Sequence, residues 1–399
     1  MSMADANSGR RFVSIWGNAV SVGEARPESY GKDITLRYPV YSAFDGDAVR
    51  LTFDNYCGTE QVTISQVSIM AKNPSDDTAE KEFFPVTFRG SRSCVIPAGS
   101  RVCSDELSLD VKAGSTFDVS MYLGDYTQLR SCVFTCGALS DGAQFASGNL
   151  TGSETFPKEL SRPTHYFYFL SNVSLRTDKK NRAVVCYGDS ITAQNWPDDL
   201  AVMLKSRQIG DTSVIRRATS GSRILREYTC LTYQSYGLKG SRRFAHEVPT
   251  DGADTVIIQQ GINDIIHPVG TDINPFRPMS DLPTAGELTE GLAYYVKLAR
   301  SYGYKVYAGT LLPIGGWRTY APFRETLRND VNEWIRSTDM IDGVVDFDNA
   351  LADPEDKTRM LPEYDSGDHL HPSKSGYRKM AQLVADNAAI FEKRAGYSH

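Results

Sequence analysis

Ser190 is the residue of this 399-residue chain whose neighbours first suggest chemistry. It follows Gly188 and Asp189 in the run Gly-Asp-Ser-Ile-Thr, directly after a short apolar segment. If a strand turns into a helix here, the free N–H groups and the positive potential of the helix N-terminus favour a developing oxyanion. Ser190 is therefore a candidate nucleophile, although an ordinary loop serine or a helix cap has the same local sequence.

His371 is the candidate base for such a serine. Asp368 precedes it by three residues in a turn bounded by Gly367 and Pro372. This spacing lets a carboxylate reach the Nδ1–H of the imidazole and hold its tautomer, which leaves Nε2 free to take a proton from a serine. Among the six histidines, only His371 combines a nearby acid with a place after a predicted strand near the end of the chain.

Two further loops carry groups that can stabilise an oxyanion. Gly221, in the run Thr-Ser-Gly-Ser, lets the backbone approach a ligand closely and can present its N–H. Asn263, in the run Gly-Ile-Asn-Asp, has a side-chain amide that can donate to an oxyanion. Each has an ordinary alternative, because glycine is common in turns and Asn-Asp can cap a helix.

Strands and helices are predicted to alternate after residue 178. Apolar runs predict strands over 183–187, 214–218, 255–259, 305–311 and 344–347. Periodicity and capping residues predict helices over 197–207, 284–303, 323–334 and 373–391. This alternation is typical of an α/β fold with a parallel sheet and helices on both faces. Active sites in such sheets lie beyond the carboxyl ends of the strands, where Ser190, Gly221 and Asn263 fall.

The first 178 residues instead follow a period of two. Val49, Leu51 and Phe53 alternate with polar residues, and so do the runs 107–111 and 117–121. We expect the last two runs to form a hairpin through the turn 112–115. Many short strands separated by turn residues are typical of an all-β sandwich. The stretch 136–163 is rich in Gly, Ser and Thr and is expected to be a long loop.

Two domains follow from this change of pattern. We predict a jelly-roll-like β-sandwich accessory domain over 1–178 and a catalytic domain over 179–399, with a polar segment at the boundary. For the accessory domain the sequence leaves three roles open, namely carbohydrate binding, contact within an oligomer, and covering of the active-site cleft. The oligomeric state is not predicted.

Composition excludes several classes of protein. With 41% hydrophobic and 23% charged residues the chain resembles an ordinary globular protein and not a disordered one. The 43 Lys and Arg do not cluster and are outnumbered by 49 Asp and Glu, which argues against a nucleic-acid partner. No apolar run reaches the roughly 18 residues of a membrane span. The N-terminus lacks the layout of a signal peptide, so we expect a cytoplasmic protein unless a leader has been removed.

The seven cysteines include no C-x-x-C pair. In a chain long enough to bury its own core, this predicts reduced thiols that serve as small apolar residues. A Cys132–Cys136 disulfide or a metal site is the alternative.

Together the four loops resemble the sequence blocks of the GDSL, or SGNH, serine hydrolases. Gly188-Asp189-Ser190 resembles the nucleophile block and Gly221 falls at the glycine of the second block. The run 261–264 resembles the G-x-N-D block, and 368–372 resembles the D-x-x-H-P block. The resemblance covers roughly residues 182–395. It implies a flavodoxin-like three-layer αβα domain, which the all-β sandwich precedes.

The resemblance also implies roles for these residues. Ser190 would be the nucleophile, His371 the base and Asp368 the acid that orients it. The N–H groups of Ser190 and Gly221 and the amide of Asn263 would form the oxyanion hole. Gly188 and Asp189 would support the nucleophile, and neither a metal ion nor an organic cofactor is required.

Other segments are similar to a bacterial subgroup of two-domain GDSL esterases with an N-terminal β-domain. They are 14–17, 96–100, 107–111, 267–268 and 364–368, together with Trp334. The chain departs from the family pattern before the second block. There it has Arg216, Arg217 and Ala218 where the family often has Asn and an extra Gly.

The predicted reaction is ester hydrolysis through an acyl-enzyme on Ser190. We expect a small-molecule or oligosaccharide ester as substrate. Short-chain esters, above all acetyl groups on carbohydrate, are favoured because the family acts on such compounds and no long apolar lid is visible. A lysophospholipase or lipase acting on longer acyl chains is the alternative. Loop aromatics could stack on a sugar, wall an acyl pocket or only pack the loops; they are Trp196, Tyr228, Tyr233, Tyr236, Trp317 and Tyr320.

Two other classes of function compete with this interpretation. A metallohydrolase could use Asp368, His369 and His371, because a His-x-His pair with a carboxylate can bind zinc. It would leave the serine and its oxyanion donors unexplained. A binding module that has lost catalysis is the other class, and the complete set of catalytic residues argues against it.

Overall fold

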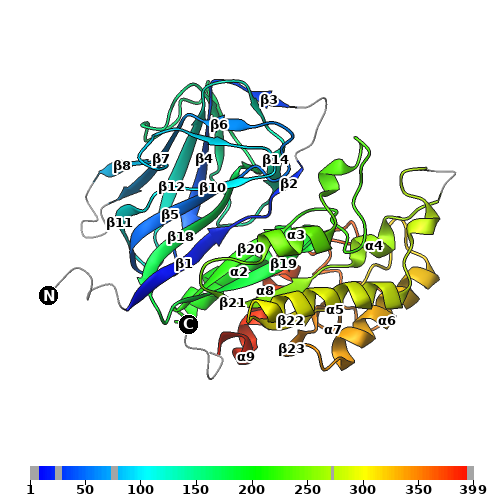
Figure 1. The fold of residues 1–399 in the computed structure, drawn as a ribbon. Helices are drawn as coiled ribbons and strands as arrows, with labels where there is room; N and C mark the ends of the chain where they lie inside the picture. Colours follow the sequence, from blue (N-terminus) through cyan, green and yellow to red (C-terminus); the bar gives the residue numbers. More distant parts are fainter. Residues whose placement is uncertain (1–8, 23–28, 73–79, 271–273, 393–399) are drawn as a thin grey trace. The chain divides into compact units, whose positions relative to one another are not determined.

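The chain forms two compact units in a computed structural model that describes residues 9–22, 29–72, 80–270 and 274–392 (Figure 1). The first unit comprises the chain up to Ala183 together with Lys205–Ile215 and Thr250–Gly252. The second comprises Val184–Leu204, Arg216–Pro249 and the chain from Ala253 onward. The grouping of these two short segments of the α/β part with the first unit has no signal in the sequence pattern.

The first unit is built from antiparallel sheets, as the period of two predicts. One large sheet contains β1 (Arg10–Gly17), β18 (Leu170–Asp178), β5 (Gly46–Asp54), β10 (Arg101–Cys103) and β11 (Leu107–Val111). The other contains β16 (Ser161–Pro163), β15 (Gln144–Ser147), β4 (Ile34–Tyr41), β12 (Thr116–Leu123), β7 (Gln66–Lys72) and β8 (Lys81–Val86). Small sheets join β13 (Thr127–Gln128) to β3 (Tyr30–Gly31), β14 (Ser131–Phe134) to β17 (Tyr166–Tyr168) and β2 (Ser21–Val22), and β6 (Val62–Ile64) to β9 (Cys94–Ile96).

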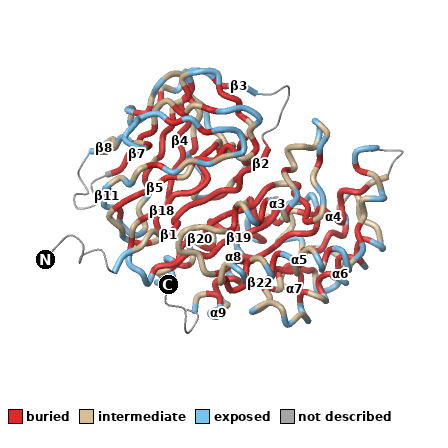
Figure 2. The backbone as a smooth tube through the Cα atoms, viewed as in Figure 1, coloured by how far each residue is buried: buried red, intermediate tan, exposed pale blue. Residues whose placement is uncertain are grey.

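The alternating residues of β5 and β12 form the core of this unit. Val49, Leu51 and Phe53 are at most 1% exposed, and Val119 and Met121 are fully buried. In β5 the intervening Arg50 and Thr52 are half-buried, so this strand has the one covered face that its sequence predicts, whereas in β12 the intervening Ser120 is fully buried as well. Figure 2 shows buried backbone running along the strands of both units.

Two predictions for this unit are wrong. The runs 107–111 and 117–121 do not form a hairpin, because β11 pairs with β5 while β12 pairs with β4 and β7 in the other sheet. The turn between them does form around Gly114, but the Gly114 N–H donates to the carbonyl oxygen of Ser42, so the chain crosses between sheets. The stretch 136–163 is also not one long loop, because β15 forms within it and pairs with β4 and β16.

The second unit surrounds a five-stranded parallel sheet, as predicted. Its strands are β20 (Thr212–Ala218), β19 (Arg182–Gly188), β21 (Ala253–Gln259), β22 (Lys305–Gly309) and β23 (Gly343–Val345), in that order. This is the flavodoxin-like order, which confirms the expected fold class. The chain order reverses between β19 and β21, and in sheets of this kind ligands bind at such a switch point, beyond the carboxyl ends of the strands. All seven residues of β19, which lies between β20 and β21, are buried.

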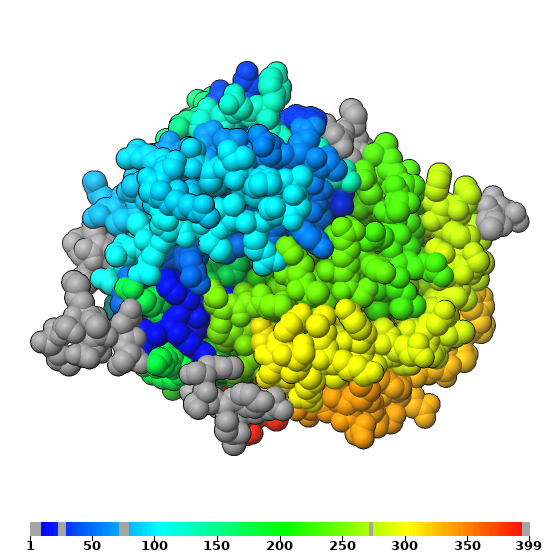
Figure 3. All heavy atoms as spheres, viewed as in Figure 1, coloured from blue at the N-terminus to red at the C-terminus, as the bar shows by residue number. Residues whose placement is uncertain are grey.

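Helices cover both faces of this sheet. They are α1 (Ser190–Ala193), α2 (Trp196–Ser206), α3 (Gly240–Glu247), α4 (Ile262–Ile266), α5 (Ala285–Ser301), α6 (Pro322–Ser337), α7 (Phe347–Leu351), α8 (Lys374–Asp386) and α9 (Ala388–Phe391). Short 3₁₀ turns are η2 (Gln234–Tyr236) and η3 (Met279–Asp281). Helices α3, α5 and α6 pack side by side, and α7 packs on α8. In Figure 3, α5 (yellow) forms part of the visible outer face of this unit.

Sequence signals explain where the longer helices begin and end. Thr284 and Glu287 form the predicted capping box of α5, whose buried residues are the apolar stripe expected for it. Ser373 caps α8 through its side chain, as predicted. The final helix does not continue to Phe391, however, because it ends at Asp386 and a separate short helix, α9, follows Asn387.

Three observations bear on the excluded classes. Within the described residues, no helix is long and apolar enough to cross a membrane. None of the seven cysteines forms a disulfide, so the Cys132–Cys136 alternative is wrong. Across the same described ranges, no group of three or more His, Cys, Asp or Glu side chains is arranged to hold a metal ion.

Candidate active site

Ser190, His371 and Asp368 form one continuous hydrogen-bonded chain. The Oγ of Ser190 lies 2.8 Å from Nε2 of His371. The Nδ1 of the same ring lies 2.6 Å from Oδ2 of Asp368. The serine begins α1 after β19, whereas the other two lie in the turn that precedes α8. The structure thus brings the predicted nucleophile, base and acid together from sequence positions 181 residues apart.

The surroundings of Asp368 favour its ionised form. Burial acts to raise the pKa of Asp368, but hydrogen bonds from the His371 ring and from the N–H groups of His371 and Leu370 outweigh it. The pKa of Asp368 therefore lies well below its usual range. An ionised carboxylate on Nδ1 holds the neutral ring with its proton on Nδ1, so Nε2 faces Ser190 as an acceptor.

Gly188 lets the chain turn from β19 into α1. A Cβ at this position would lie 2.4 Å from the carbonyl oxygen of Gln259 and 2.5 Å from Oγ1 of Thr192. The glycine is needed here for space, because β21 and α1 approach its Cα too closely for any side chain. Its own carbonyl oxygen accepts from the N–H of Thr219, which links the loops after β19 and β20.

Asp189 caps the short helix that Ser190 begins. Its Oδ1 accepts from the N–H of Ile191 at 3.0 Å, while Oδ2 is buried and has no hydrogen-bond partner among the described residues. The residue is fully buried, and burial raises the pKa of Asp189 to about 7 despite the hydrogen bond from Ile191. Asp189 therefore holds the backbone beside the nucleophile at the cost of a carboxyl group that ionises reluctantly.

The predicted oxyanion donors Ser190, Gly221 and Asn263 lie shortly after the ends of β19, β20 and β21, respectively. Within the described residues, no hydrogen bond uses the backbone N–H of Ser190 or Gly221, so both remain available to a substrate oxygen. Gly221 has a φ of +76°, a conformation that favours glycine. Asn263 is buried, and its Nδ2 donates one hydrogen to the carbonyl oxygen of Ser222 at 3.1 Å. The second hydrogen of that amide is left for an oxyanion.

Asp264 fixes the loop after β20 against the start of α4. Its two carboxyl oxygens accept from the N–H groups of Ile224 and Leu225 at 2.8 and 3.1 Å. Burial raises the pKa of Asp264 to about 6, although these hydrogen bonds act to lower it. The start of α4, which carries Asn263, is thus joined to the loop containing Gly221 by the hydrogen bonds of the Asn263 and Asp264 side chains to the backbone of that loop.

Buried cationic side chains hold the other end of α4. Arg324 donates to the carbonyl oxygens of Ile265 and Pro268, and Arg277 Nε donates to that of His267 at 2.7 Å. The last carbonyls of a helix lack partners within the helix and carry partial negative charge, so arginines are well placed there. This anchoring matters because α4 is only five residues long and carries Asn263.

A second Asp–His pair lies beside the Asp368–His371 pair, and sequence reasoning missed it. Asp365 Oδ2 lies 2.6 Å from Nδ1 of His369, and Asp365 Oδ1 accepts from the N–H groups of Gly367 and His369. His369 adopts a φ of +64°, which is unusual for a residue other than glycine. Because the two rings are held by different carboxylates, Asp368, His369 and His371 are not arranged as the zinc site considered above.

The loop aromatics divide between core and surface. Trp196 is fully buried and packs on Phe347, so it belongs to the core of this unit and cannot contact a substrate. Tyr228 is also buried, whereas Tyr233 and Tyr236 are half-buried. Trp317 and Tyr320, after β22, are half-buried as well.

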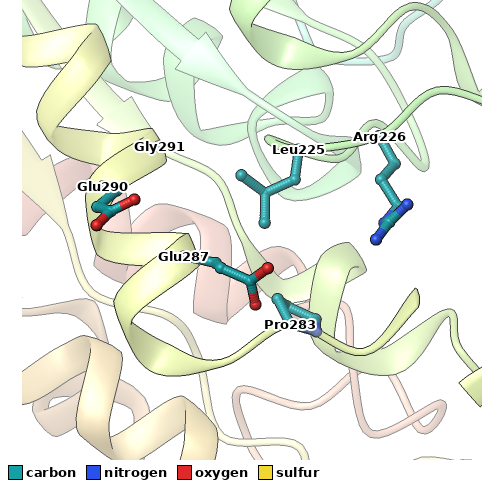
Figure 4. A pocket seen from close by; sticks show the side chains of 6 residues that line it. All are labelled: Leu225, Arg226, Pro283, Glu287, Glu290 and Gly291. Atoms are coloured by element: carbon teal, nitrogen blue, oxygen red, sulfur yellow. The ribbon is translucent and has the colours of Figure 1, made fainter. Parts of the chain in front are cut away.

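A pocket of about 500 Å³ lies between the loop after β20 and the first turns of α5 (Figure 4). Its lining residues are Leu225, Arg226, Pro283, Glu287, Glu290 and Gly291. None of them is a predicted catalytic residue. Glu287 is already engaged in the cap of α5, and Arg226 pairs with Asp281. Two of the three charged lining residues, Arg226 and Glu287, are thus engaged within the protein.

Comparison with known proteins places this unit among hydrolases. The family model for GDSL-like lipases and acylhydrolases matches residues 184–384. A GDSL-like lipase from Bacteroides thetaiotaomicron is 22% identical, with 54% of this chain and 90% of that chain covered and a TM-score of 0.38. A catalytic mutant of an acetylxylan esterase from Geobacillus stearothermophilus is 17% identical, with 55% and 97% covered and a TM-score of 0.39. No curated protein matches the chain.

Proposed function

Because the chain belongs to the GDSL-like lipase and acylhydrolase family and is an ester hydrolase, we propose that Ser190, His371 and Asp368 are its catalytic triad. The observation that carries this proposal is the continuous hydrogen-bonded chain from Ser190 Oγ through the His371 ring to Asp368. A serine hydroxyl is a weak nucleophile unless an oriented base can take its proton, and this arrangement supplies that base.

The reaction begins with attack of Ser190 Oγ on the ester carbonyl carbon. His371 Nε2 takes the hydroxyl proton as the new C–O bond forms, and Asp368 stabilises the resulting imidazolium. The carbonyl oxygen becomes an oxyanion, which accepts hydrogen bonds from the N–H groups of Ser190 and Gly221 and from the Asn263 amide.

Collapse of this intermediate expels the alcohol, which takes the proton from His371 and leaves an acyl group on Ser190. A water molecule then attacks the acyl-enzyme with His371 again acting as base. The second intermediate collapses to free the carboxylic acid and restore the serine. Both halves use the same oxyanion donors, so the loops carrying Gly221 and Asn263 act twice in each turnover.

Short-chain esters, above all acetyl groups on carbohydrate, are the proposed substrates. In support, no long apolar lid is visible in the sequence around the predicted catalytic loops.

The test is a substrate panel with the purified full-length chain. It should include p-nitrophenyl esters of increasing acyl length and acetylated mono- and oligosaccharides, with Ser190→Ala as the control for uncatalysed release. We expect kcat/KM to be highest for acetyl esters and to fall with chain length. A maximum at long acyl chains would instead support the lipase or lysophospholipase alternative.

A further inference from the structure

The ring of Tyr236 lies directly against Gly221. A Cβ built on Gly221 would lie 2.3, 2.4 and 2.9 Å from three atoms of this ring, and these are its three nearest neighbours. Tyr236 belongs to η2, in the long connection between β20 and α3. The ring therefore covers the Cα of the glycine whose N–H is a proposed oxyanion donor, and it limits where that backbone can move.

The Tyr236 ring also contacts the segment that carries Asn263, the second proposed oxyanion donor. Tyr236 stacks on the imidazole of His267, with ring centroids 4.9 Å apart and planes inclined by 30°. His267 follows α4 directly, and its N–H donates to the carbonyl oxygen of Asn263 at 3.1 Å. Two stacked rings thus form a physical connection from Gly221 to the backbone of Asn263.

The His267 ring is itself held in place. It is buried, and its Nδ1 lies 3.3 Å from the hydroxyl of Tyr228. Burial, together with the nearby Arg277 and Arg223, keeps the pKa of His267 well below its ordinary value, so the ring is neutral. A neutral, fixed imidazole gives Tyr236 a constant surface on which to stack.

We propose that Tyr236 and His267 are positioning residues that set the separation between the Gly221 N–H and the Asn263 amide. This inference rests on the proposed oxyanion hole. Its physical basis is that donors stabilise an oxyanion only when they lie about 2.7–3.1 Å from it, so a shift of a few tenths of an ångström in one loop weakens the transition state. The ring contact resists such a shift without touching the reacting atoms.

The first experiment compares three variants on p-nitrophenyl acetate, a substrate without a sugar to stack. Tyr236→Ala should lower kcat about ten- to hundred-fold, a part of the loss from removing a whole donor, with KM changed by less than about three-fold. Tyr236→Phe keeps the ring and should retain most of kcat. Tyr233→Ala is the matched control, because its ring stacks on Tyr236 but is not among the nearest neighbours of a Gly221 Cβ. It should change kcat by about three-fold or less.

A double-mutant cycle with Asn263→Ala separates positioning from general stability. If Tyr236 acts through the oxyanion donors, Tyr236→Ala should cost clearly less in the Asn263→Ala background than in the wild type. The pH–rate profile should keep its shape, since the triad is untouched, and thermal unfolding should show each variant folded at the assay temperature.

The inference is overturned if Tyr236→Ala leaves kcat unchanged. It is also overturned if Tyr233→Ala or Tyr236→Phe costs as much, or if the loss is fully additive with Asn263→Ala. Failure of the proposed function looks different, because Ser190→Ala and Asn263→Ala would then themselves leave ester turnover unchanged.

Discussion

The Oγ of Ser190 and the Nε2 of His371 lie 2.8 Å apart, although 181 residues separate them in sequence. The parallel sheet creates this proximity. Ser190 lies two residues after the end of the buried strand β19, and the turn carrying His371 precedes α8. Since loops after parallel strands gather at one edge of a sheet, the fold brings together the proposed base and the proposed nucleophile, which come from two distant segments.

The two histidines of the Asp368–His371 turn should differ sharply in function. His371→Ala should lower kcat/KM by about three to four orders of magnitude, because Ser190 loses its base. His369→Asn should cost about ten-fold or less, since its ring is held by Asp365 and is not bonded to Ser190. Asparagine is chosen because it tolerates the left-handed backbone at this position.

Both variants should be assayed on one small ester from pH 5 to 9. An inactive His369→Asn together with an active His371→Ala would mean that the base has been misassigned and that Asp365 is its acid.

Asn263→Ala tests the side-chain donor of the oxyanion hole. It should lower kcat by about 10²–10³, the usual loss for one such donor, with little change in KM. The variant also loses the hydrogen bond to Ser222, so Asn263→Asp is a useful companion that keeps the side-chain size and replaces the donor by an acceptor. Steady-state kinetics on an acetyl ester measure both. An effect confined to KM would mean that Asn263 only binds substrate.

Gly188→Ala should disrupt the nucleophile without removing any catalytic group. The added methyl carbon would meet the Gln259 carbonyl and Thr192, which cannot both move without shifting β21 or α1. We expect destabilisation of about 1–3 kcal/mol, typical of overpacking a core, and a strong loss of kcat as Ser190 is displaced. Gly303→Ala is a suitable control for adding a methyl group in open space, although its backbone φ of +81° carries a cost of its own. Chemical denaturation and ester kinetics report the two effects. Wild-type values for both would contradict the packing argument.

Asp189 should make folding stability fall as pH rises. Burial raises its pKa to about 7 from an ordinary value of 3.8, so between these values the folded chain holds a proton that the unfolded chain has lost. The free energy of unfolding then decreases across that window with increasing pH. Asp189→Asn keeps an acceptor for Ile191 and cannot ionise. The melting temperature of this variant minus that of the wild type should therefore be larger at pH 8 than at pH 4.5. An equal difference at the two pH values would contradict the assignment.

The sequence was sufficient to predict the α/β sheet and the residues that meet at its edge. Strand and helix periods after residue 178 are regular, and the capping box of α5 is encoded by Thr284 and Glu287. The serine, glycine, asparagine and histidine blocks each follow a predicted element, so the sheet alone places them at one edge. These features can be predicted because each period or cap depends only on residues within one helix or strand.

What could not be predicted depends on long-range partners. A turn around Gly114 fits a hairpin and a crossing between sheets equally well, and only the pairing of β12 with β4 decides between them. The left-handed backbone of His369 and its carboxylate partner Asp365 have no periodic signature. Tyr236 lies in a connection without helical or strand period, so nothing in the sequence indicates that its ring rests on Gly221.

Labelling of the full-length chain by a fluorophosphonate probe tests the central claim most directly. The reagent forms a stable bond only with a serine that an adjacent base activates. We expect one label per chain, located at Ser190 by peptide mass spectrometry, and loss of ester turnover in proportion to labelling. Ser190→Ala should abolish both. Stoichiometric labelling at another serine, or full turnover by Ser190→Ala, would contradict the account.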